Sequence, residues 1–333
     1  MRLKKLSRLV NPQSIALVVV LLVNWILFPG FFNVTWQDGR LFGSLIDVLN
    51  RGVAILAIGM SAVIATKGVD LSVGAVMAIS GALAATLVVD GHPAYVAVSA
   101  ALAIGVLCGI WNGILVAILE IQPIVATLVL MVAGRGIAQL ITEGSIVTFA
   151  DPVLIFIGTG SFAGLPMPVV IAAVLLALSV FLVRSSAIGL FIESVGVNRA
   201  AASLAGIRSG LLLVAVYGFS GFCAAISGLI VAGDIKGADA NNAGLWLELD
   251  AILAVVIGGT SLLGGRFSIA MSVMGAIIIQ AMNTGILVSG FPPEFNLVVK
   301  AGVIIVIFIM QSPLATRFIE FRKAMRLLDR KET

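Results

Sequence analysis

Runs of about 20 apolar residues, separated by short polar breaks, recur along most of the chain. A helix of about that length crosses a hydrocarbon core roughly 30 Å thick. A membrane-spanning barrel would instead show segments of about 10 alternating residues, and the sequence contains none. Of the 333 residues, 60% are hydrophobic and 11% are charged, whereas a soluble domain carries roughly 25% charged residues. The sequence therefore predicts an all-α polytopic membrane protein.

Ten apolar runs fit this length, and residues 1–333 are expected to form a single transmembrane domain with a basic tail at residues 312–333. The expected spans are Ser14–Phe32, Leu45–Thr66, Leu71–Val89, Ala94–Leu119, Pro123–Ile141, Met167–Val183, Leu211–Ala232, Leu247–Leu263, Ser268–Val288 and Phe295–Gln311. The first run has no convincing cleavage site and is expected to be retained. A longer linker at residues 142–166 contains glycine, proline and serine, and we expect an ordered outer loop there.

The distribution of basic residues predicts the orientation. With the N-terminus inside, fifteen of the 20 Lys and Arg residues fall on inner segments, and the outer segments carry only Arg40 and Lys236. Because cytoplasmic loops retain positive charge, both termini are expected to be cytoplasmic; in a bacterial inner membrane, that side would be the compartment that holds ATP. The pI near 9.3 then reflects orientation and does not indicate a nucleic-acid partner.

Few residues in the sequence suit catalysis or metal binding. The two cysteines, Cys108 and Cys223, lie inside apolar runs, and the one histidine, His92, lies in a Gly-His-Pro turn. We therefore expect neither a disulfide framework, nor a metal site, nor catalytic residues. A Gly-x-x-x-x-Gly-Lys-[Ser/Thr] phosphate loop is also absent, so the chain is not expected to hydrolyse ATP.

The longest polar interruption between two apolar runs is residues 184–210, near the middle of the chain. It begins with Arg184-Ser185-Ser186, which should end the preceding span. Ala200–Ala202 are strong helix formers, with Asn198 suited to cap the helix and Gly206 suited to stop it. The pattern predicts a short helix outside the membrane on the cytoplasmic side. It would either dock a soluble partner or serve only as a connection.

Three acidic residues lie at span ends, where a charge within the membrane costs roughly 2.5–3.5 kcal/mol and usually faces a cavity or a partner. Asp70 and nearby Ser72 lie among glycines that permit a broken helix at a cavity. Alternatively, Asp70 caps the following helix. Glu248 and Asp250 are two residues apart and lie on different faces of a helix, so they are not an acid–base pair. They would bind a solute or cap their helix.

Uncharged polar residues also occur inside the spans, namely Asn24, Asn50, Asn112, Gln139, Gln280 and Asn283. They suit a hydroxyl-rich solute, or they hydrogen-bond a neighbouring helix. Arg51 follows Asp47 by four residues, which is a helical ion-pair spacing. Arg135 and Lys300 have no sequence-adjacent partner. The acidic starts of the third and eighth spans, which run in opposite directions, hint at inverted repeats.

Three stretches resemble the permease subunits of bacterial ribose-type sugar ABC importers. They are GVDLSVG at Gly68–Gly74, VGVNRAAASLAGI at Val195–Ile207 and ELDAILAVVIGGTSLLGG at Glu248–Gly265. They occur in the order of that family, and the resemblance covers nearly the whole chain. The stretches DGRLFGSLIDVLNR, WNGILVAI and GADANNAGLWLELD are more similar still to the galactofuranose branch, which also handles other furanose and pentose sugars.

The resemblance implies a type II importer permease fold of ten helices and no cofactor on this chain. It implies a cytoplasmic ABC ATPase that binds ATP and magnesium, a periplasmic sugar-binding protein, and a second permease, either a homologous chain or another copy. Val197–Ser203 matches the helix that couples the permease to the ATPase. The residues expected to serve that coupling are Glu193, Gly196, Val197, Asn198, Arg199, Ala200, Ala201, Ala202 and Ser203. Arg199 stands where many ribose permeases have Glu.

The leading hypothesis is therefore a permease that imports a monosaccharide by alternating access. The residues expected along the sugar pathway are Asp70, Ser72, Asn112, Glu248, Asp250 and Asn283. The main alternative is a secondary, ion-coupled transporter that uses the three carboxylates as proton relays. An intramembrane enzyme lacks a nucleophile–base pair or metal ligands in this sequence, and a purely structural scaffold would show no solute effect.

Overall fold

A computed structural model describes residues 52–288 without a gap, and individual residues between 17 and 48 and between 290 and 305. The chain forms two units, Met1–Thr284 and Gly285–Thr333. The account below concerns the first unit; in the second, residues 285–288 and 297–302 are helical. The predicted spans Ser14–Phe32 and Phe295–Gln311, the tail at residues 312–333 and the Asp47–Arg51 pair lie largely or wholly outside the described residues.

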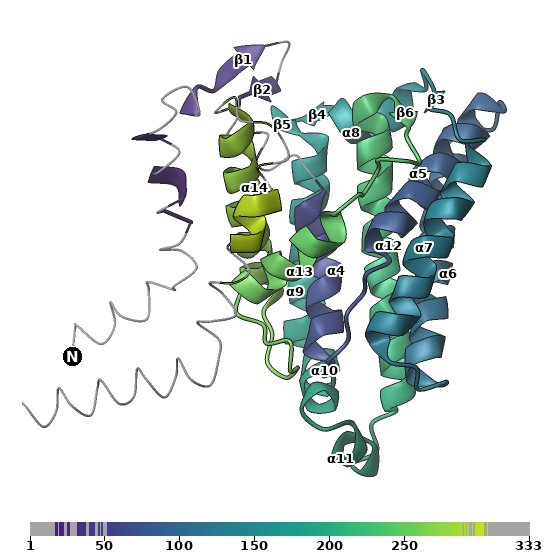
Figure 1. Ribbon diagram of the computed structural model, residues 1–333, viewed down its shortest axis with the longest axis vertical. Helices are drawn as coiled ribbons and strands as arrows, with labels where there is room; N and C mark the ends of the chain where they lie inside the picture. Colours follow the sequence, from purple (N-terminus) through teal and green to yellow (C-terminus); the bar gives the residue numbers. More distant parts are fainter. Residues whose placement is uncertain are drawn as a thin grey trace, which may run out of the picture. The chain divides into compact units, whose positions relative to one another are not determined.

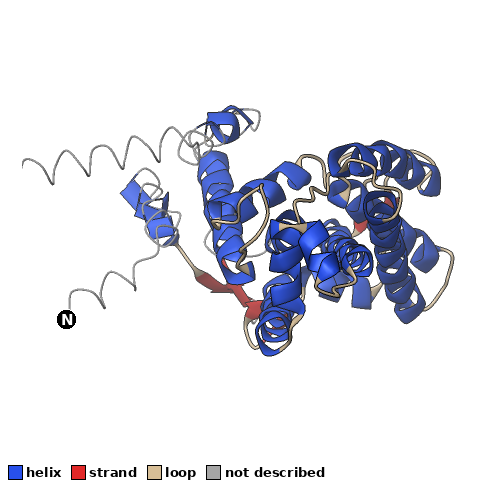
Figure 2. Cartoon of the chain, turned by 90° about the horizontal axis from the view of Figure 1, so that it is seen from below, coloured by secondary structure: helices blue, strands red, loops and turns tan. Residues whose placement is uncertain are grey.

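The described part of the chain is mostly helical (Figure 1). Its helices are α4 (Val53–Ala65), α5 (Val73–Val89), α6 (Ala94–Ala117), α7 (Pro123–Ile141), α8 (Pro152–Thr159), α9 (Met167–Ser185), α10 (Ile188–Val197), α11 (Arg199–Leu204), α12 (Ser209–Ile235), α13 (Leu247–Ile257) and α14 (Ile269–Val288). The strands are short antiparallel pairs: β1 (Thr35–Gln37) with β2 (Arg40–Phe42), β3 (Val147–Thr148) with β6 (Gly237–Ala238), and β4 (Ser161–Phe162) with β5 (Leu165–Pro166). Figure 2 shows how small a share of the structure they form.

Five of the described helices, α6, α7, α9, α12 and α14, are long and apolar enough to cross a membrane. Helices α4, α5 and α10 are apolar but shorter. Multiple membrane crossings are therefore supported, and the number ten stays a prediction. The expectation of a full span over Leu247–Leu263 is wrong in its extent, because α13 ends at Ile257, where Gly258 and Gly259 follow. Gly259 has φ +90°, a left-handed conformation that interrupts a helix.

Helix α12 is the most buried of the five and packs against α4, α5, α6 and α8. Glycines lie in its contact with α6, where their lack of a side chain lets the two helices approach closely, as is usual in membranes. A Cβ atom added at Gly109 would collide with the carbonyl oxygen of Tyr217, and one at Gly105 would lie 2.6 Å from the carbonyl oxygen of Gly221. The backbones of α6 and α12 therefore touch directly.

The linker at residues 142–166 is ordered, as the sequence predicted. It contains β3, β4, β5 and the helix α8. Asp151 caps α8 by accepting the backbone N–H groups of Val153 and Leu154, each at 2.9 Å, and Pro152 is its first residue. The strand β3 pairs with β6, so this linker is joined to the chain that follows α12.

Two irregular segments interrupt the bundle: the α4–α5 segment (residues 66–72) and the α12–α13 segment (residues 239–246). Figure 1 shows the first rising from the lower end of α4, beside α10 and α11, and the second descending from the upper end of α12. The second segment meets the first turn of α5, directly after the first segment, at two glycines. A Cβ atom added at Gly74 would collide with the carbonyl oxygen of Gly244, and one added at Gly244 with that of Gly74. The broken helix expected near Asp70 is therefore present.

Candidate functional site

Asp70 is buried in the α4–α5 segment, and both of its carboxylate oxygens accept hydrogen bonds. Oδ1 accepts the backbone N–H of Ser72 at 3.0 Å and the Ser72 hydroxyl at 2.6 Å. Oδ2 accepts the Ser220 hydroxyl of α12 at 2.8 Å. The Asn112 amide of α6 donates to Ser72 Oγ at 2.8 Å. The carboxylate therefore joins the start of α5 to α6 and α12.

Asp70 also lies at the start of the next helix. The N-cap of α5 is Ser72, which makes no capping bond with its side chain, whereas Asp70 accepts the Ser72 N–H two residues on, as a capping side chain does. Both the capping role and the pathway role of Asp70 therefore stay predictions. Asp70, Ser72 and Asn112 come together as expected for a common site, but each is at most 1% exposed. Sequence reasoning missed Ser220, and its only signal was a hydroxyl inside an apolar run. The side-chain oxygen of Asn112, Oδ1, is buried without a hydrogen-bond partner in the described part of the chain.

Asp250 and Asn283 form a second, separate pair between α13 and α14. The Asn283 amide donates to Asp250 Oδ2 at 3.4 Å and to Gln280 Oε1 at 3.3 Å. Both residues are buried. Glu248 and Asp250 lie in the first turn of α13, where their negative charge complements the helix dipole.

Glu248 belongs to neither group and lies where the α12–α13 segment meets the first turn of α5. A Cβ atom added at Gly74 would be 2.5 Å from Glu248 Oε2. Glu248 is 5% exposed, and its Oε2 has no hydrogen-bond partner among the residues that the structure describes. The six residues expected along the pathway are thus divided among three places, and all six are buried.

Arg135, unexplained by the sequence, holds the α12–α13 segment against α7. Its Nη1 donates to the carbonyl oxygens of Ala240 at 3.0 Å and Ala243 at 2.6 Å. Gln139, one turn further along α7, donates to Asn241 Oδ1 at 2.8 Å. These partners are backbone carbonyls and a side chain about 100 residues away, so no local pattern could reveal them.

Asp239 orders the start of the α12–α13 segment. Its Oδ1 accepts the backbone N–H groups of Asn241 and Asn242, at 3.0 Å and 3.2 Å, and its Oδ2 accepts the Asn242 side-chain amide at 2.8 Å. These bonds, led by the Asn242 side-chain amide, hold the pKa of Asp239 below its usual value. A carboxylate that stays ionised keeps this turn in place.

The polar stretch at residues 184–210 forms α10 and α11. Asn198 is the N-cap of α11, and its side chain accepts the backbone N–H of Ala201 at 3.0 Å. Gly206 follows the helix with φ +88°. The short helix, its cap and its stop are therefore confirmed, whereas α10 was not predicted as a helix. Val197 and Leu204 are 68% and 91% exposed, so apolar side chains project from this end of the bundle.

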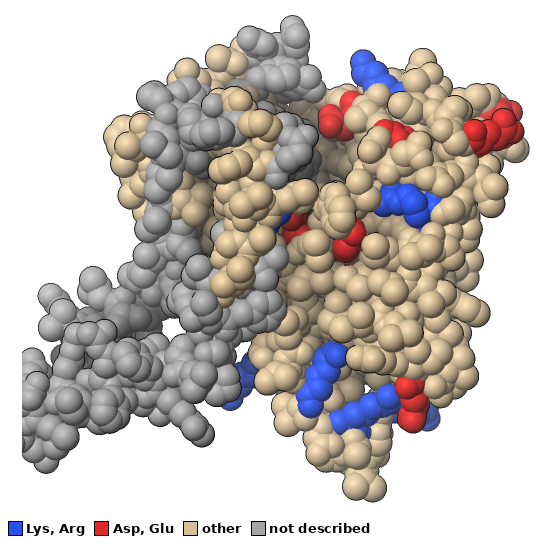
Figure 3. Space-filling view, viewed as in Figure 1, with Lys and Arg blue, Asp and Glu red and all other residues tan. Residues whose placement is uncertain are grey.

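The α10–α11 segment is bonded to the ends of several other helices. Lys67 Nζ donates to the carbonyl oxygen of Val197 at 3.0 Å, and Arg199 Nη2 donates to that of Ala117, at the end of α6, at 2.6 Å. A Cβ atom added at Gly196 would collide with the carbonyl oxygen of Ala65, the last residue of α4. The N–H of Gly265 donates to the same oxygen at 2.9 Å. Figure 3 shows basic side chains gathered near this end of the visible face.

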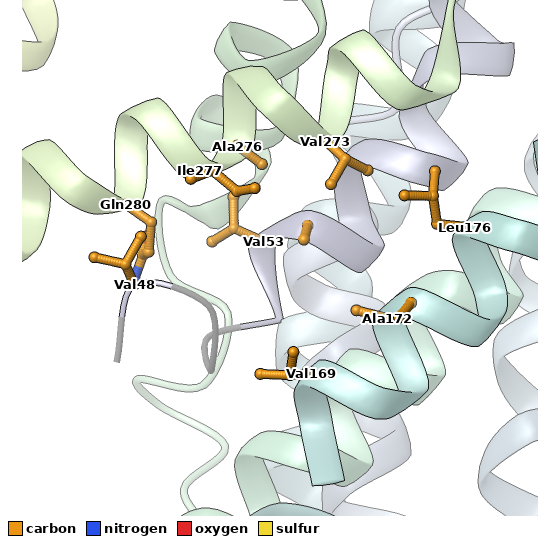
Figure 4. A pocket seen from close by; sticks show the side chains of 11 residues that line it. Val48, Val53, Val169, Ala172, Leu176, Val273, Ala276, Ile277 and Gln280 are labelled. Atoms are coloured by element: carbon orange, nitrogen blue, oxygen red, sulfur yellow. The ribbon is translucent and has the colours of Figure 1, made fainter. Parts of the chain in front are cut away.

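Two cavities lie between the described helices. One of about 400 Å³ lies beside the α10–α11 segment and is lined by Lys67, Gly68 and Arg199 among others. The other, of about 140 Å³, lies between α4, α9 and α14 (Figure 4). Apolar side chains line it, with Gln280 at its edge. Within the described part of the chain, no three His, Cys, Asp or Glu residues are grouped to hold a metal ion.

Comparison with known proteins identifies relatives over nearly the full length. The chain is 60% identical to the galactofuranose transporter permease protein YtfT of Escherichia coli, over 96% of this chain and 93% of the relative. It is 40% identical to the fructose import permease protein FruF of Bifidobacterium longum, over 93% and 89%. It is 36% identical to the ribose import permease protein RbsC of Escherichia coli, over 90% and 92%.

No solved structure matches the chain significantly. A family model described as "Branched-chain amino acid transport system / permease component" matches residues 47–308. This match includes both irregular segments, the two groups of buried polar residues and the α10–α11 segment. The chain therefore belongs to this family of transport-system permeases. It is a transport subunit, and its apolar helices fit a multi-pass membrane protein.

Proposed function

We propose that this chain is the permease subunit of an ATP-driven importer that moves a monosaccharide across the bacterial inner membrane. The proposed sugar is galactofuranose or another furanose or pentose. The observation that carries the proposal is the 60% identity to a galactofuranose transporter permease over almost the whole of both chains. Fructose and ribose import permeases at 40% and 36% identity support the broader sugar class.

The proposed partners are a cytoplasmic ABC ATPase that binds ATP and magnesium, a periplasmic sugar-binding protein, and a second permease that is either a homologous chain or another copy. The orientation proposed places both termini and α10–α11 in the cytoplasm. The exposed Val197 and Leu204 support a partner at α11, since a partner would cover these apolar side chains.

A ten-helix type II fold with inverted repeats belongs to the same proposal. The α4–α5 and α12–α13 segments, which enter from opposite ends, support it.

We place the sugar pathway at the Gly74–Gly244 contact. When the α12–α13 segment and the first turn of α5 part, the Glu248 carboxylate, whose Oε2 has no hydrogen-bond partner among the described residues, becomes available to a sugar hydroxyl. Asp70, Ser72 and Asn112 hold one segment, while Asp250 and Asn283 hold the start of α13 to α14. In this proposal Asp70, whose carboxylate accepts hydrogen bonds from Ser72 and Ser220, positions the start of α5 against α12.

Reconstitution in vesicles tests the proposal. The chain is assembled with its ATPase and second permease, and uptake of radiolabelled sugar is measured with and without ATP and the binding protein. Uptake that requires both, and that a protonophore leaves unchanged, is expected. Concentrative uptake by this chain alone, or uptake that a protonophore abolishes, would contradict the proposal and favour an ion-coupled transporter.

A further inference from the structure

Lys67 occupies the junction between α4 and the α4–α5 segment in a backbone conformation that is unusual for its type. Its φ of +64° lies in the left-handed region, which glycine adopts with less strain. Other described residues that are not glycine, Lys236 among them, share a positive φ, so Lys67 is distinguished by what its side chain contacts. Lys67 is exposed, yet its side chain is held by contacts with other parts of the chain.

The side chain reaches two other elements at once. Lys67 Nζ donates to the carbonyl oxygen of Val197, the last residue of α10, at 3.0 Å. A cation at a helix C-terminus satisfies an orphan carbonyl and complements the helix dipole. The stem of the side chain lies against the turn before α14, since a Cβ atom added at Gly264 would be 2.5 Å from Lys67 Cγ.

From Lys67 the chain leads directly to the buried polar site. Asp70 follows three residues later and is bonded to Ser220 of α12, and Gly74 then meets Gly244 of the α12–α13 segment. Lys67 and Gly68 also line the cavity of about 400 Å³, so this part of the segment has room to move on one side. The other basic contact, from Arg199, reaches only the end of α6.

We propose that Lys67 is a positioning residue that passes the displacement of α10–α11 to the α4–α5 segment. It would thereby link ATP hydrolysis in the partner to the opening of the Gly74–Gly244 contact. This inference rests on the proposed function. It differs from the expected docking of α11 on the ATPase, because it assigns the next step, within this chain, to one side chain.

The test uses the complete importer in proteoliposomes and measures the sugar transported per ATP hydrolysed. Lys67→Met keeps the stem and removes the donor, whereas Lys67→Arg keeps a donor. Lys236→Met is the matched control, because Lys236 also has a left-handed φ, of +54°, and an exposed side chain, but lies at the end of α12 away from α10. Lys67→Gln, with a shorter donor, is measured alongside so that the test does not depend on one variant. Recovery of the ATPase with each variant is measured first.

Lys67→Met is expected to assemble normally and to lower the sugar-to-ATP ratio about fivefold, the size of effect typical of a residue within a coupling network. Lys67→Arg should restore most of the ratio, and Lys236→Met should leave it unchanged. An unchanged ratio in Lys67→Met would overturn the inference. So would loss of assembly in both Lys67→Met and Lys67→Gln, which would make Lys67 a folding residue. Absence of ATP-dependent uptake by the unaltered importer would instead refute the proposed function.

Discussion

At the scale of single residues, the polar groups in the bundle connect helices and are not open to solvent. Asp70 is 1% exposed, and its carboxylate accepts hydrogen bonds from Ser72, from Ser220 of α12 and, at 3.5 Å, from Asn112 of α6. A buried charge is stable only when hydrogen bonds replace its lost hydration. A hydrogen-bond donor to a charged acceptor should therefore contribute more to the free energy of unfolding than a donor to a neutral acceptor.

Two serines of α12 allow that dependence to be measured. Ser220→Ala removes a donor to the Asp70 carboxylate, and the free energy of unfolding should fall by about 1.5–3 kcal/mol, as for hydrogen bonds to charged groups. Ser227→Ala is the matched control, since Ser227 is equally buried but donates to the neutral carbonyl oxygen of Gly52 at 3.1 Å. It should lose about 1 kcal/mol. Thermal unfolding of the purified variants in detergent gives the comparison, and equal losses would contradict the special role of the Asp70 carboxylate.

Gly74 is the second residue for which the structure predicts a specific cost. Gly74→Ala places a methyl group against the carbonyl oxygen of Gly244 and the Glu248 carboxylate. Overpacking of this kind costs about 1–3 kcal/mol, so the thermal midpoint should fall. Gly136→Ala, in α7 with open space around it, should be neutral or slightly stabilising because alanine favours a helix. A midpoint unchanged by Gly74→Ala would mean that the first turn of α5 and the α12–α13 segment are not in contact.

At the scale of elements, the sequence predicted what depends on local patterns. Span Pro123–Ile141 coincides with α7, the break at Ser185 and Ser186 ends α9, and Asn198 caps α11. The sequence did not predict α10 or the early end of α13. Gly196 and Gly258, at the ends of these helices, also make close backbone contacts with Ala65 and Met271, which no local pattern reveals. In the same way, the sequence selected Asp70 but could not show that Ser220, 150 residues away, would bind it.

The attachment of α11 to α6 gives a prediction at the scale of elements. Arg199→Met removes the donor to the Ala117 carbonyl oxygen and leaves the C-terminus of α6 without this cation. The sugar transported per ATP should fall about tenfold, consistent with loss of a charged hydrogen bond, while the protein still inserts into the membrane. Arg208→Met, which removes an exposed basic residue in the same stretch, should change the ratio little. Unaltered uptake and ATPase recovery in Arg199→Met would contradict the assignment of Val197–Ser203 as the coupling helix.

At the scale of the whole molecule, the charges and the two irregular segments define opposite ends of the bundle. The α4–α5 segment starts beside α10 and α11, and the α12–α13 segment starts at the other end of α12, near β3 and β6. Basic residues gather at the α10–α11 end, as expected for a cytoplasmic surface. If this end faces the cytoplasm, the Gly74–Gly244 contact lies on a route by which a movement imposed there could reach the opposite end.

This orientation predicts which side chains a membrane-impermeant thiol reagent can reach. Cys108 and Cys223 are first replaced by alanine, and a single cysteine is introduced as Lys236→Cys or as Leu204→Cys. Both target side chains are exposed, and Leu204 is 91% exposed, so a difference in labelling reports the side of the membrane and not burial. In intact spheroplasts Lys236→Cys should react within minutes, whereas Leu204→Cys should react only after the membrane is permeabilised. The reverse pattern would place α11 in the periplasm, out of reach of any ATPase. The proposed docking of α11 on the ATPase and the proposed role of Lys67 both require an ATP-driven partner on the side of α11. Neither role would be possible if α11 were periplasmic.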